Sequence, residues 1–253
     1  MERGNFNSAI EYLIAKYRLA KIENISGDSA GTIITCNKGV FNFFCDFSPK
    51  EIQREGTEVP LFTWRKERRY FEMRKNLIDG IIRDPVGMRI KHIAPLDTNL
   101  ANLLVREVDL AQWILGERVN KVFASSTDNY CNAIFSTDKG IKISAEIGTA
   151  QTRTPILLHE VIAKTGVITD TAVDTQIENY PIYLYNSQGT KIYNDVDFEL
   201  YGLSYDDIAK VRFIVSVLVD PTIVCELQEA YRHAMAVFKT AQKSAASIKN
   251  LAV

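Results

Sequence analysis

The stretch NLLVREVDLAQWILGERV, residues 102–119, predicts the helix around which the rest of the fold can be arranged. In its second half, apolar side chains recur at spacings of three and four residues, which places them on one helical face. They are Val105, Val108, Leu110, Trp113, Ile114 and Leu115. Gly116 follows where a helix would end, because glycine readily adopts the left-handed conformation of a helix C-terminus. The first half of the stretch is less easily explained, since it carries Arg106 where an active-site helix would present its chemistry.

Three segments elsewhere in the chain have the pattern of β-hairpins. Each consists of two runs rich in β-branched and aromatic residues, joined by a short turn that contains glycine. The paired runs are residues 31–36 with 40–47, 133–137 with 141–147, and 183–185 with 190–193. Three such hairpins predict a mainly antiparallel sheet.

Further helices are predicted on both sides of these hairpins. Residues 6–17 have helical apolar spacing, and Ser8 with Glu11 forms a capping-box signal. Residues 64–82 predict the end of a strand that runs into a helix, with an apolar stripe of Tyr70, Met73, Leu77 and Ile81.

Two more helices are predicted near the C-terminus. Ser204 and Asp207 mark the start of one that runs to about Leu218. Asp220 and Pro221 then supply an N-cap and a first helical proline for a longer helix. The predicted fold class is α+β, an open and mostly antiparallel β-sheet with helices packed on one face.

Composition and charge exclude several classes of protein. A chain of 253 residues with 46% hydrophobic and 24% charged residues has the composition of a globular protein. Its formal net charge of -1 gives no overall attraction to nucleic acid or to an anionic membrane. Four cysteines without close spacing favour free thiols over a disulfide framework. The N-terminal residues contain no apolar run typical of a signal peptide, so we expect a cytoplasmic protein.

Segment 49–60 is the best candidate for a linker, since it is rich in proline, glycine and charge. We therefore expect an N-terminal segment of helix and hairpin over residues 1–59 and a domain over residues 60–253.

Several motifs within residues 60–253 together resemble a known family. They include FTWRKERRYFEMRKNLIDGIIRDPVGMRIKHI at 62–93, the Asp-Leu-x-x-Trp-x-x-Gly helix end at 109–116, HEVIAKTGVITD at 159–170 and the closing Lys-Ser-Ala at 243–245. In this order and spacing they resemble the C-terminal domain of the Gfo/Idh/MocA oxidoreductases, the family of glucose-fructose oxidoreductase and inositol dehydrogenase. The resemblance covers some three quarters of the chain.

The resemblance implies a substrate-shaping domain that normally follows an NAD(P)-binding Rossmann domain. These 253 residues contain no G-x-G-x-x-G sequence, and the nearest glycine pair, Gly27 and Gly31, precedes a predicted hairpin. Residues 1–59 are also shorter than a nucleotide-binding domain of about 100 or more residues. We therefore expect no cofactor on this chain.

The family's proton-transfer residues are also replaced. Its usual pattern D-x-G-x-H-x-x-D, aligned on Asp109, places Asn102, Leu104 and Arg106 where the resemblance implies Asp, Gly and a catalytic His. A guanidinium stays protonated near neutral pH, so Arg106 is a poor substitute for an imidazole acid or base. The Glu-Lys-Pro motif of the family has no counterpart either. The sequence predicts loss of dehydrogenase activity and no catalytic residue.

A polar ligand pocket is a remaining hypothesis. By family resemblance, Arg65 lies where a strand end points toward the substrate cleft, so Arg65, Arg106 and Asp109 could together bind a hydroxylated or acidic ligand. The alternative is that Arg106 pairs with a surface carboxylate.

Histidines and a basic run have ordinary interpretations. His92, His159 and His233 lie far apart in sequence without flanking ligands, which favours surface or core residues over a metal site or a catalytic triad. The run RKERRYFEMRK at 65–75 has six basic and two acidic residues, which favours a solvated helix face over a phosphate site.

The resulting hypothesis is a non-catalytic oligomeric or ligand-binding module derived from a sugar or polyol dehydrogenase domain. The alternative is an oxidoreductase subunit whose partner chain supplies the NAD(P)-binding domain. We expect no nucleic acid or membrane partner, and a homo-oligomer formed through the sheet, because Ile141, Ile143 and Ala145 would give it an apolar side that must be covered.

Overall fold

The computed structural model describes residues 6–27, 31–45, 56–171, 181–193 and 203–253. The chain divides into two compact units, one of residues 1–67 with 196–232 and one of residues 68–195 with 233–253. The sequence prediction placed a boundary at residue 59 and did not assign residues 196–232 to the first unit. Helices return to that unit late in the chain, a long-range association that local sequence patterns do not encode.

The first unit contains a small sheet with the strand order β1-β2-β3-β4. Strands β1 (Ile22–Gly27), β2 (Gly31–Cys36) and β3 (Gly39–Phe44) are antiparallel, whereas β4 (Thr57–Pro60) lies parallel to β3. The β2–β3 hairpin confirms the first predicted hairpin. The linker prediction was wrong for residues 57–60, which pair with β3 as a strand, and residues 49–55 of that predicted linker lie outside the described residues.

Four helical elements complete the first unit. They are α1 (Phe6–Tyr17), the short 3₁₀ helix η1 (Thr63–Lys66), α5 (Tyr205–Val219) and the start of α6 (Ile223–Ser247). Two hydrogen bonds fasten α5 within the unit, from Lys38 Nζ to the Leu218 carbonyl at 2.6 Å and from Arg212 Nη1 to the Lys66 carbonyl at 3.3 Å.

The predicted helix starts are correct for α5 and displaced for α1 and α6. Ser204 caps α5 by accepting a hydrogen bond from the Asp207 amide, as expected. Helix α1 already includes Ser8, so the predicted capping box does not form. Asp220 accepts a hydrogen bond from the Thr222 amide at 3.1 Å, one turn before α6 begins.

The second unit is built on a nine-stranded sheet with the order β12-β11-β10-β9-β5-β8-β7-β6-β13. Its strands are β5 (Pro85–Pro95), β6 (Val119–Thr127), β7 (Tyr130–Thr137), β8 (Lys142–Ala150), β9 (Ile156–Ala163), β10 (Gly166–Thr169), β11 (Ile182–Asn186), β12 (Gly189–Tyr193) and β13 (Leu251–Ala252). Among the strands that the structure describes in this sheet, only β5 and β8 form a parallel pair. The predicted α+β class, the mostly antiparallel sheet and the other two hairpins, β7–β8 and β11–β12, are confirmed.

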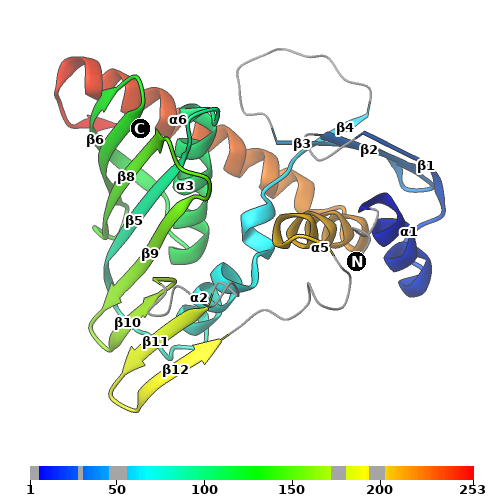
Figure 1. The fold of residues 1–253 in the computed structure, drawn as a ribbon, viewed down its shortest axis with the longest axis horizontal. Helices are drawn as coiled ribbons and strands as arrows, with labels where there is room; N and C mark the ends of the chain where they lie inside the picture. The colour runs from blue at the N-terminus through cyan, green and yellow to red at the C-terminus, as the bar shows by residue number, and fades with distance from the viewer. Residues whose placement is uncertain (1–5, 28–30, 46–55, 172–180, 194–202) are drawn as a thin grey trace. The chain divides into compact units, whose positions relative to one another are not determined.

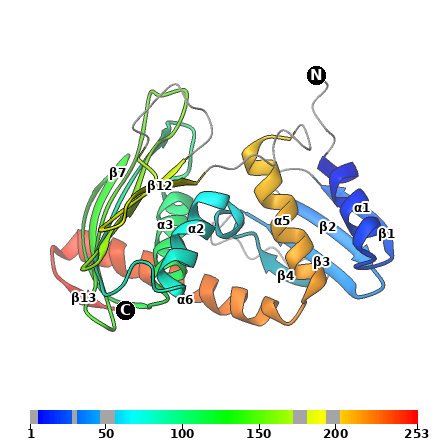
Figure 2. The ribbon, with the colours of Figure 1, turned by 90° about the horizontal axis from the view of Figure 1, so that it is seen from below.

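Helices α2 (Arg68–Ile78) and α3 (Leu100–Leu115) lie on one face of this sheet (Figures 1 and 2). The predicted helix of the 102–119 stretch is confirmed as α3, and Gly116 ends it with a φ of 67°. The last part of α6 is attached to β6, next to the edge strand β13, where Ser244 Oγ accepts a hydrogen bond from the Ala124 amide at 3.0 Å. No helix of the described residues is long and apolar enough to cross a membrane.

The sheet argument for a homo-oligomer needs a correction. Ile141, Ile143 and Ala145 are at most 6% exposed, and α3 packs against β8 on this side of the sheet. The chain thus covers the apolar side by itself, and the opposite face carries Lys142 and Ser144. The oligomer itself stays a prediction.

Candidate functional site

Helix α3 directs a carboxylate into the interior of the second unit. Leu103, Leu110 and Ile114 form the buried stripe of the helix, and Glu107 lies on the same stripe with 0% exposure. The helix is held at its start by Asn99, whose side chain accepts a hydrogen bond from the Ala101 amide at 2.8 Å. Because an isolated buried charge is costly, Glu107 requires partners of opposite charge.

The central strands supply two histidines to this carboxylate. In the β5–β9 pair His159 lies opposite Ile90, and His92 follows two residues after Ile90, so both imidazoles lie on the helix-covered face. Glu107 Oε1 is 2.6 Å from His92 Nδ1, and its Oε2 is 2.8 Å from His159 Nε2. One carboxylate therefore joins two strands that are adjacent in the sheet.

A second carboxylate extends the network beyond His159. Asp170, directly after β10, places Oδ2 2.7 Å from His159 Nδ1, and Arg69 Nη1 of α2 lies 3.7 Å from the same oxygen. The Tyr70 hydroxyl is 3.2 Å from His159 Nδ1. A hydrogen-bonded chain thus runs from Asp170 through His159 and Glu107 to His92. We call Arg69, His92, Arg106, Glu107, His159 and Asp170 the buried charge cluster.

Arg106 belongs to this cluster. Its Nη1 pairs with Glu107 Oε1, and its guanidinium carbon lies 5.7 Å from the centre of the Tyr70 ring. The Arg106 side chain is 15% exposed. The alternative predicted for Arg106, pairing with a carboxylate, is thus correct in kind, but the partner is buried and is the next residue along the chain.

The charges inside the cluster reinforce each other. Burial lowers the pKa of His159, but the carboxylates of Asp170 and Glu107 outweigh it and raise the pKa to about 9. Burial raises the pKa of Glu107, yet Arg106 and His159 hold it well below its usual value. At neutral pH His159 is therefore an imidazolium that donates from both nitrogens, between two ionised carboxylates.

His92 is the neutral member of the cluster. Burial lowers its pKa, and the hydrogen bond to Glu107 offsets this only in part. The neutral imidazole donates from Nδ1 to Glu107, which assigns its tautomer. Arg106 Nη1, 3.0 Å from the same Nδ1, is then a neighbour on the shared carboxylate rather than a second hydrogen-bond partner.

The cluster joins helices and strands through ion pairs and hydrogen bonds, and its charged groups are occupied by one another. Three cations, Arg69, Arg106 and His159, face two carboxylates, so every charge has a partner within reach. Within the described ranges, no group of three or more His, Cys, Asp or Glu side chains is placed to hold a metal ion. The imidazoles and carboxylates that might ligate one already bind each other.

The three residues predicted to bind a ligand lie in different parts of the fold. Arg65 belongs to the first unit, 8% exposed in η1, where its guanidinium carbon lies 4.7 Å from the centre of the Phe62 ring. Arg106 and Asp109 share α3 in the second unit, and Asp109 is 1% exposed. A ligand site of all three stays a prediction.

The sequence interpretation missed the convergence of the histidines. His92 and His159 were expected to be ordinary and separate, but both bind Glu107, whereas His233 lies apart with Nε2 3.2 Å from the Val119 carbonyl. The basic run was also not a fully solvated face, since Arg69 and Glu72 are buried. A charged residue on the apolar stripe of the 102–119 helix was the signal that could have revealed a buried partner.

Comparisons with known proteins identify solved structures that share the fold of this chain. No family model matches the sequence, and no curated protein sequence matches it. Solved structures do match. An oxidoreductase domain protein from Kribbella flavida has a TM-score of 0.63 at 13% identity, over 78% of this chain and 66% of that one.

Two further structures agree. An oxidoreductase from Agrobacterium radiobacter, solved in complex with NAD+, L-tartaric acid and magnesium, has a TM-score of 0.61 at 14% identity, over 78% of this chain and 65% of that one. The myo-inositol 2-dehydrogenase from Lactobacillus plantarum has a TM-score of 0.56 at 15% identity, over 76% of this chain and 63% of that one.

The chain spans just under two thirds of the length of these structures, and identities this low establish the fold alone. The fold expected from the sequence motifs is confirmed. The chain has the fold of the C-terminal domain of Gfo/Idh/MocA-type oxidoreductases.

Proposed function

We propose that this chain is a non-catalytic module built on a dehydrogenase C-terminal fold, and that it acts by binding a ligand or by assembly. The observation that carries the proposal is the pairing of Arg106 with Glu107. Family resemblance implies a catalytic histidine at position 106, and the residue found there is an arginine whose guanidinium belongs to a buried ion pair.

This pairing removes the chemistry that the position would supply. A general acid or base must exchange a proton near neutral pH, and a guanidinium does not lose its proton in proteins. His159 does not replace the missing group, since it donates from both ring nitrogens, and the His92 imidazole is buried at 5% exposure with its Nδ1 bonded to Glu107.

The class of ligand that we propose is hydroxylated or acidic. Arg65, Arg106 and Asp109 are the candidates for its recognition, by resemblance to the substrate-shaping role of this domain. Fold-level analogy with sugar and polyol dehydrogenases supports the class of ligand but no individual compound.

Assembly through the outer face of the large sheet is the second part of the proposal. This face, opposite α2 and α3, carries exposed apolar side chains, among them Ile134 at 46%, Phe123 at 38% and Ile156 at 53% exposure. Contact between two copies would cover them, most simply in a homodimer. Light scattering at high micromolar concentration tests this part, since a monomer mass would contradict it.

Calorimetry with NAD+, NADH, NADP+ and NADPH tests the non-catalytic assignment. We expect no saturable binding to the 253-residue chain, and a micromolar one-to-one isotherm would contradict the proposal. Arg106→His should have no dehydrogenase activity toward a panel of polyols and sugar acids, because a proton acceptor is useless without a bound hydride carrier. Arg106→Lys, which keeps the positive charge beside Glu107, is the matched variant if the histidine variant does not fold.

The alternative, an oxidoreductase subunit completed by a partner chain, gives a different result. Addition of the partner that supplies the nucleotide domain would then produce turnover that neither chain shows alone. A thermal-shift screen of this chain with sugars and sugar acids tests ligand binding itself, because a ligand that binds only the folded state raises its apparent stability.

A further inference from the structure

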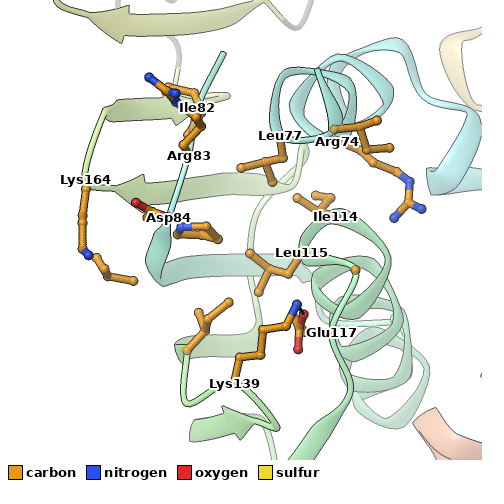
Figure 3. A pocket seen from close by; sticks show the side chains of 15 residues that line it. Arg74, Leu77, Ile82, Arg83, Asp84, Ile114, Leu115, Glu117, Lys139 and Lys164 are labelled. Carbon is orange, nitrogen blue, oxygen red and sulfur yellow. Dashed lines mark ion pairs between the residues drawn. The ribbon is translucent and has the colours of Figure 1, made fainter. Parts of the chain in front are cut away.

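A pocket of about 640 Å³ opens in the second unit, away from the buried charge cluster. The last turns of α2 and α3 form one wall, and the start of β5 and two β-turns form the other. Figure 3 shows Leu77, Ile114 and Leu115 on the helix side, with Arg83, Asp84 and Lys164 across from them. The volume lies within the range of about 300–1,000 Å³ that is typical of sites for small organic ligands.

The floor of this pocket is apolar and rigid. Ile82, Ile114 and Ile141 are 1%, 2% and 6% exposed, so they belong to the packed core below the pocket. Leu77 and Leu115 are half-buried and close the helix side. An aliphatic or aromatic body of a ligand would cover these side chains and remove apolar surface from water.

The basic residues around the pocket fall into two groups. Arg74 donates to the Trp113 carbonyl and lies over the Trp113 ring, and Lys139 pairs with Glu117. Arg83 and Lys164, in contrast, form no ion pair with any residue that the structure describes. These two cations remain available to a ligand.

The net charge of the groups around the pocket mouth is positive, even after the carboxylates and the negative helix ends are counted. Among the lining side chains, four cations face the two carboxylates of Asp84 and Glu117. The C-terminal ends of α2 and α3 add about half a negative charge each. About one positive charge remains, which selects an anion.

Hydrogen bonds from the backbone amides fix the main chain at the two residues that carry the free cations. The Arg83 amide donates to Thr165 Oγ1 at 2.7 Å, and the Lys164 amide donates to the Asp84 carbonyl at 3.2 Å. Asp84 itself has a φ of 55°, a conformation that few residues other than glycine adopt. The β9–β10 turn and the entry to β5 are thus fastened to each other, so the mouth is a preformed frame.

We infer that this pocket binds an amphipathic organic anion, with the apolar body against Leu77, Leu115 and Ile82 and the anionic head at the rim that carries Arg83 and Lys164. The ligand class is a carboxylate with an aliphatic or aromatic tail. The site is separate from Arg106 and does not depend on the function proposed above.

Titration calorimetry with sodium decanoate, below its micellar concentration, tests this inference. We expect saturable one-to-one binding that is weakened about two- to fivefold by Arg83→Gln and by Lys164→Gln, the range for exposed ion pairs. Leu115→Gln places an amide against the apolar body and should weaken binding more than either charge change.

Three comparisons decide the outcome. Lys243→Gln removes an exposed charge of α6 that does not line the pocket and should leave decanoate binding unchanged. Decyltrimethylammonium, which has the same tail with a cationic head, should bind at least tenfold more weakly. Equal affinity for the two amphiphiles, no binding of decanoate, or equal effects of Lys243→Gln and Lys164→Gln would each overturn the inference.

Discussion

Two charged regions of the second unit share the same elements and differ in how their charges are used. The buried charge cluster and the pocket both draw on α2, α3 and β5, with Arg69, Glu107 and His92 in the first and Arg74, Leu115 and Pro85 in the second. In the cluster every cation meets a carboxylate, whereas at the pocket Arg83 and Lys164 meet none in the described part of the chain. Paired interior charges fix the arrangement of helices and strands, and unpaired cations at a mouth remain free to bind.

The substitution Glu107→Gln should cause the largest loss of stability among the tests of this contrast. The variant leaves Arg106 and His159 without their shared counter-charge in the interior, and breaking a buried pair in this way costs about 3–5 kcal/mol of unfolding free energy. Urea denaturation measures it. Glu146→Gln, on the opposite face of the sheet with its side chain 46% exposed, is the control and should cost at most 1 kcal/mol or so. Equal losses in the two variants would contradict the role assigned to Glu107.

Alkaline pH should weaken the cluster without any mutation. His159 has a pKa of about 9 in the folded state and about 6.5 when unfolded, so its stabilising protonation is fully present below 6.5 and lost as pH rises through 9. The shift corresponds to roughly 3 kcal/mol at 1.36 kcal/mol per pKa unit. Guanidinium denaturation between pH 6.5 and 9.5 should therefore show falling stability.

His92 and the carboxylates of the cluster should make the folded state less stable as pH falls, whereas His159 makes it less stable as pH rises. Their pKa values are lowered by folding, so the stability they contribute is present above their unfolded pKa values and is lost as pH falls. Stability should then be greatest near pH 6.5. Asp170→Asn removes a main cause of the raised His159 pKa and should flatten the alkaline limb, and an unchanged slope in that variant would exclude His159 as its source.

Arg106→Ala is expected to have a smaller effect than loss of Glu107. The buried carboxylate keeps its bonds to both histidines but loses one charged donor, a cost of about 1.5–3 kcal/mol. The pKa of Glu107 should rise, so acid unfolding should begin at a higher pH. Arg89→Ala is the matched control, because Arg89 pairs with Glu160 at 3.3 Å while its side chain is 62% exposed. A loss no larger than that of the control would reduce Arg106 to a surface charge.

The smallest effect is expected at the pocket. Arg83→Gln and Lys164→Gln should each change the unfolding free energy by about 0.5 kcal/mol or less, since neither side chain takes part in an ion pair of the described residues. Thermal denaturation without ligand checks this. A loss of 2 kcal/mol or more would show that Arg83 and Lys164 stabilise the fold. The pocket and the buried charge cluster would then not differ in how they use their charges.

Much of this fold could be predicted from local helix and hairpin patterns. The buried charge cluster could not, because it depends on strands that are far apart in the sequence. The helix of α3, its end at Gly116 and three hairpins follow from local spacing and turn residues. His92 and His159 are 67 residues apart and become neighbours only because β9 pairs with β5. Nothing in the residues beside either histidine signals that pairing.

The return of α5 and of the start of α6 to the first unit escaped prediction for the same reason. Arg106 gives a second example of what the sequence alone does not predict. The sequence indicates that position 106 is unusual, but it favours a surface carboxylate as the partner, because carboxylates are rarely found on the buried stripe of a helix.

The position of β5 between β8 and β9 also sets a constraint on how the chain folds during synthesis. Both neighbours of this central strand are made later, beginning with β8 at Lys142, 47 residues after β5 ends at Pro95. At roughly 5–20 residues per second, β5 has no strand partner for about 2–10 s. Contacts of such long sequence separation also slow folding. Helix α3 is the next element to emerge, and its apolar face can shield the inner side of β5 until those strands arrive.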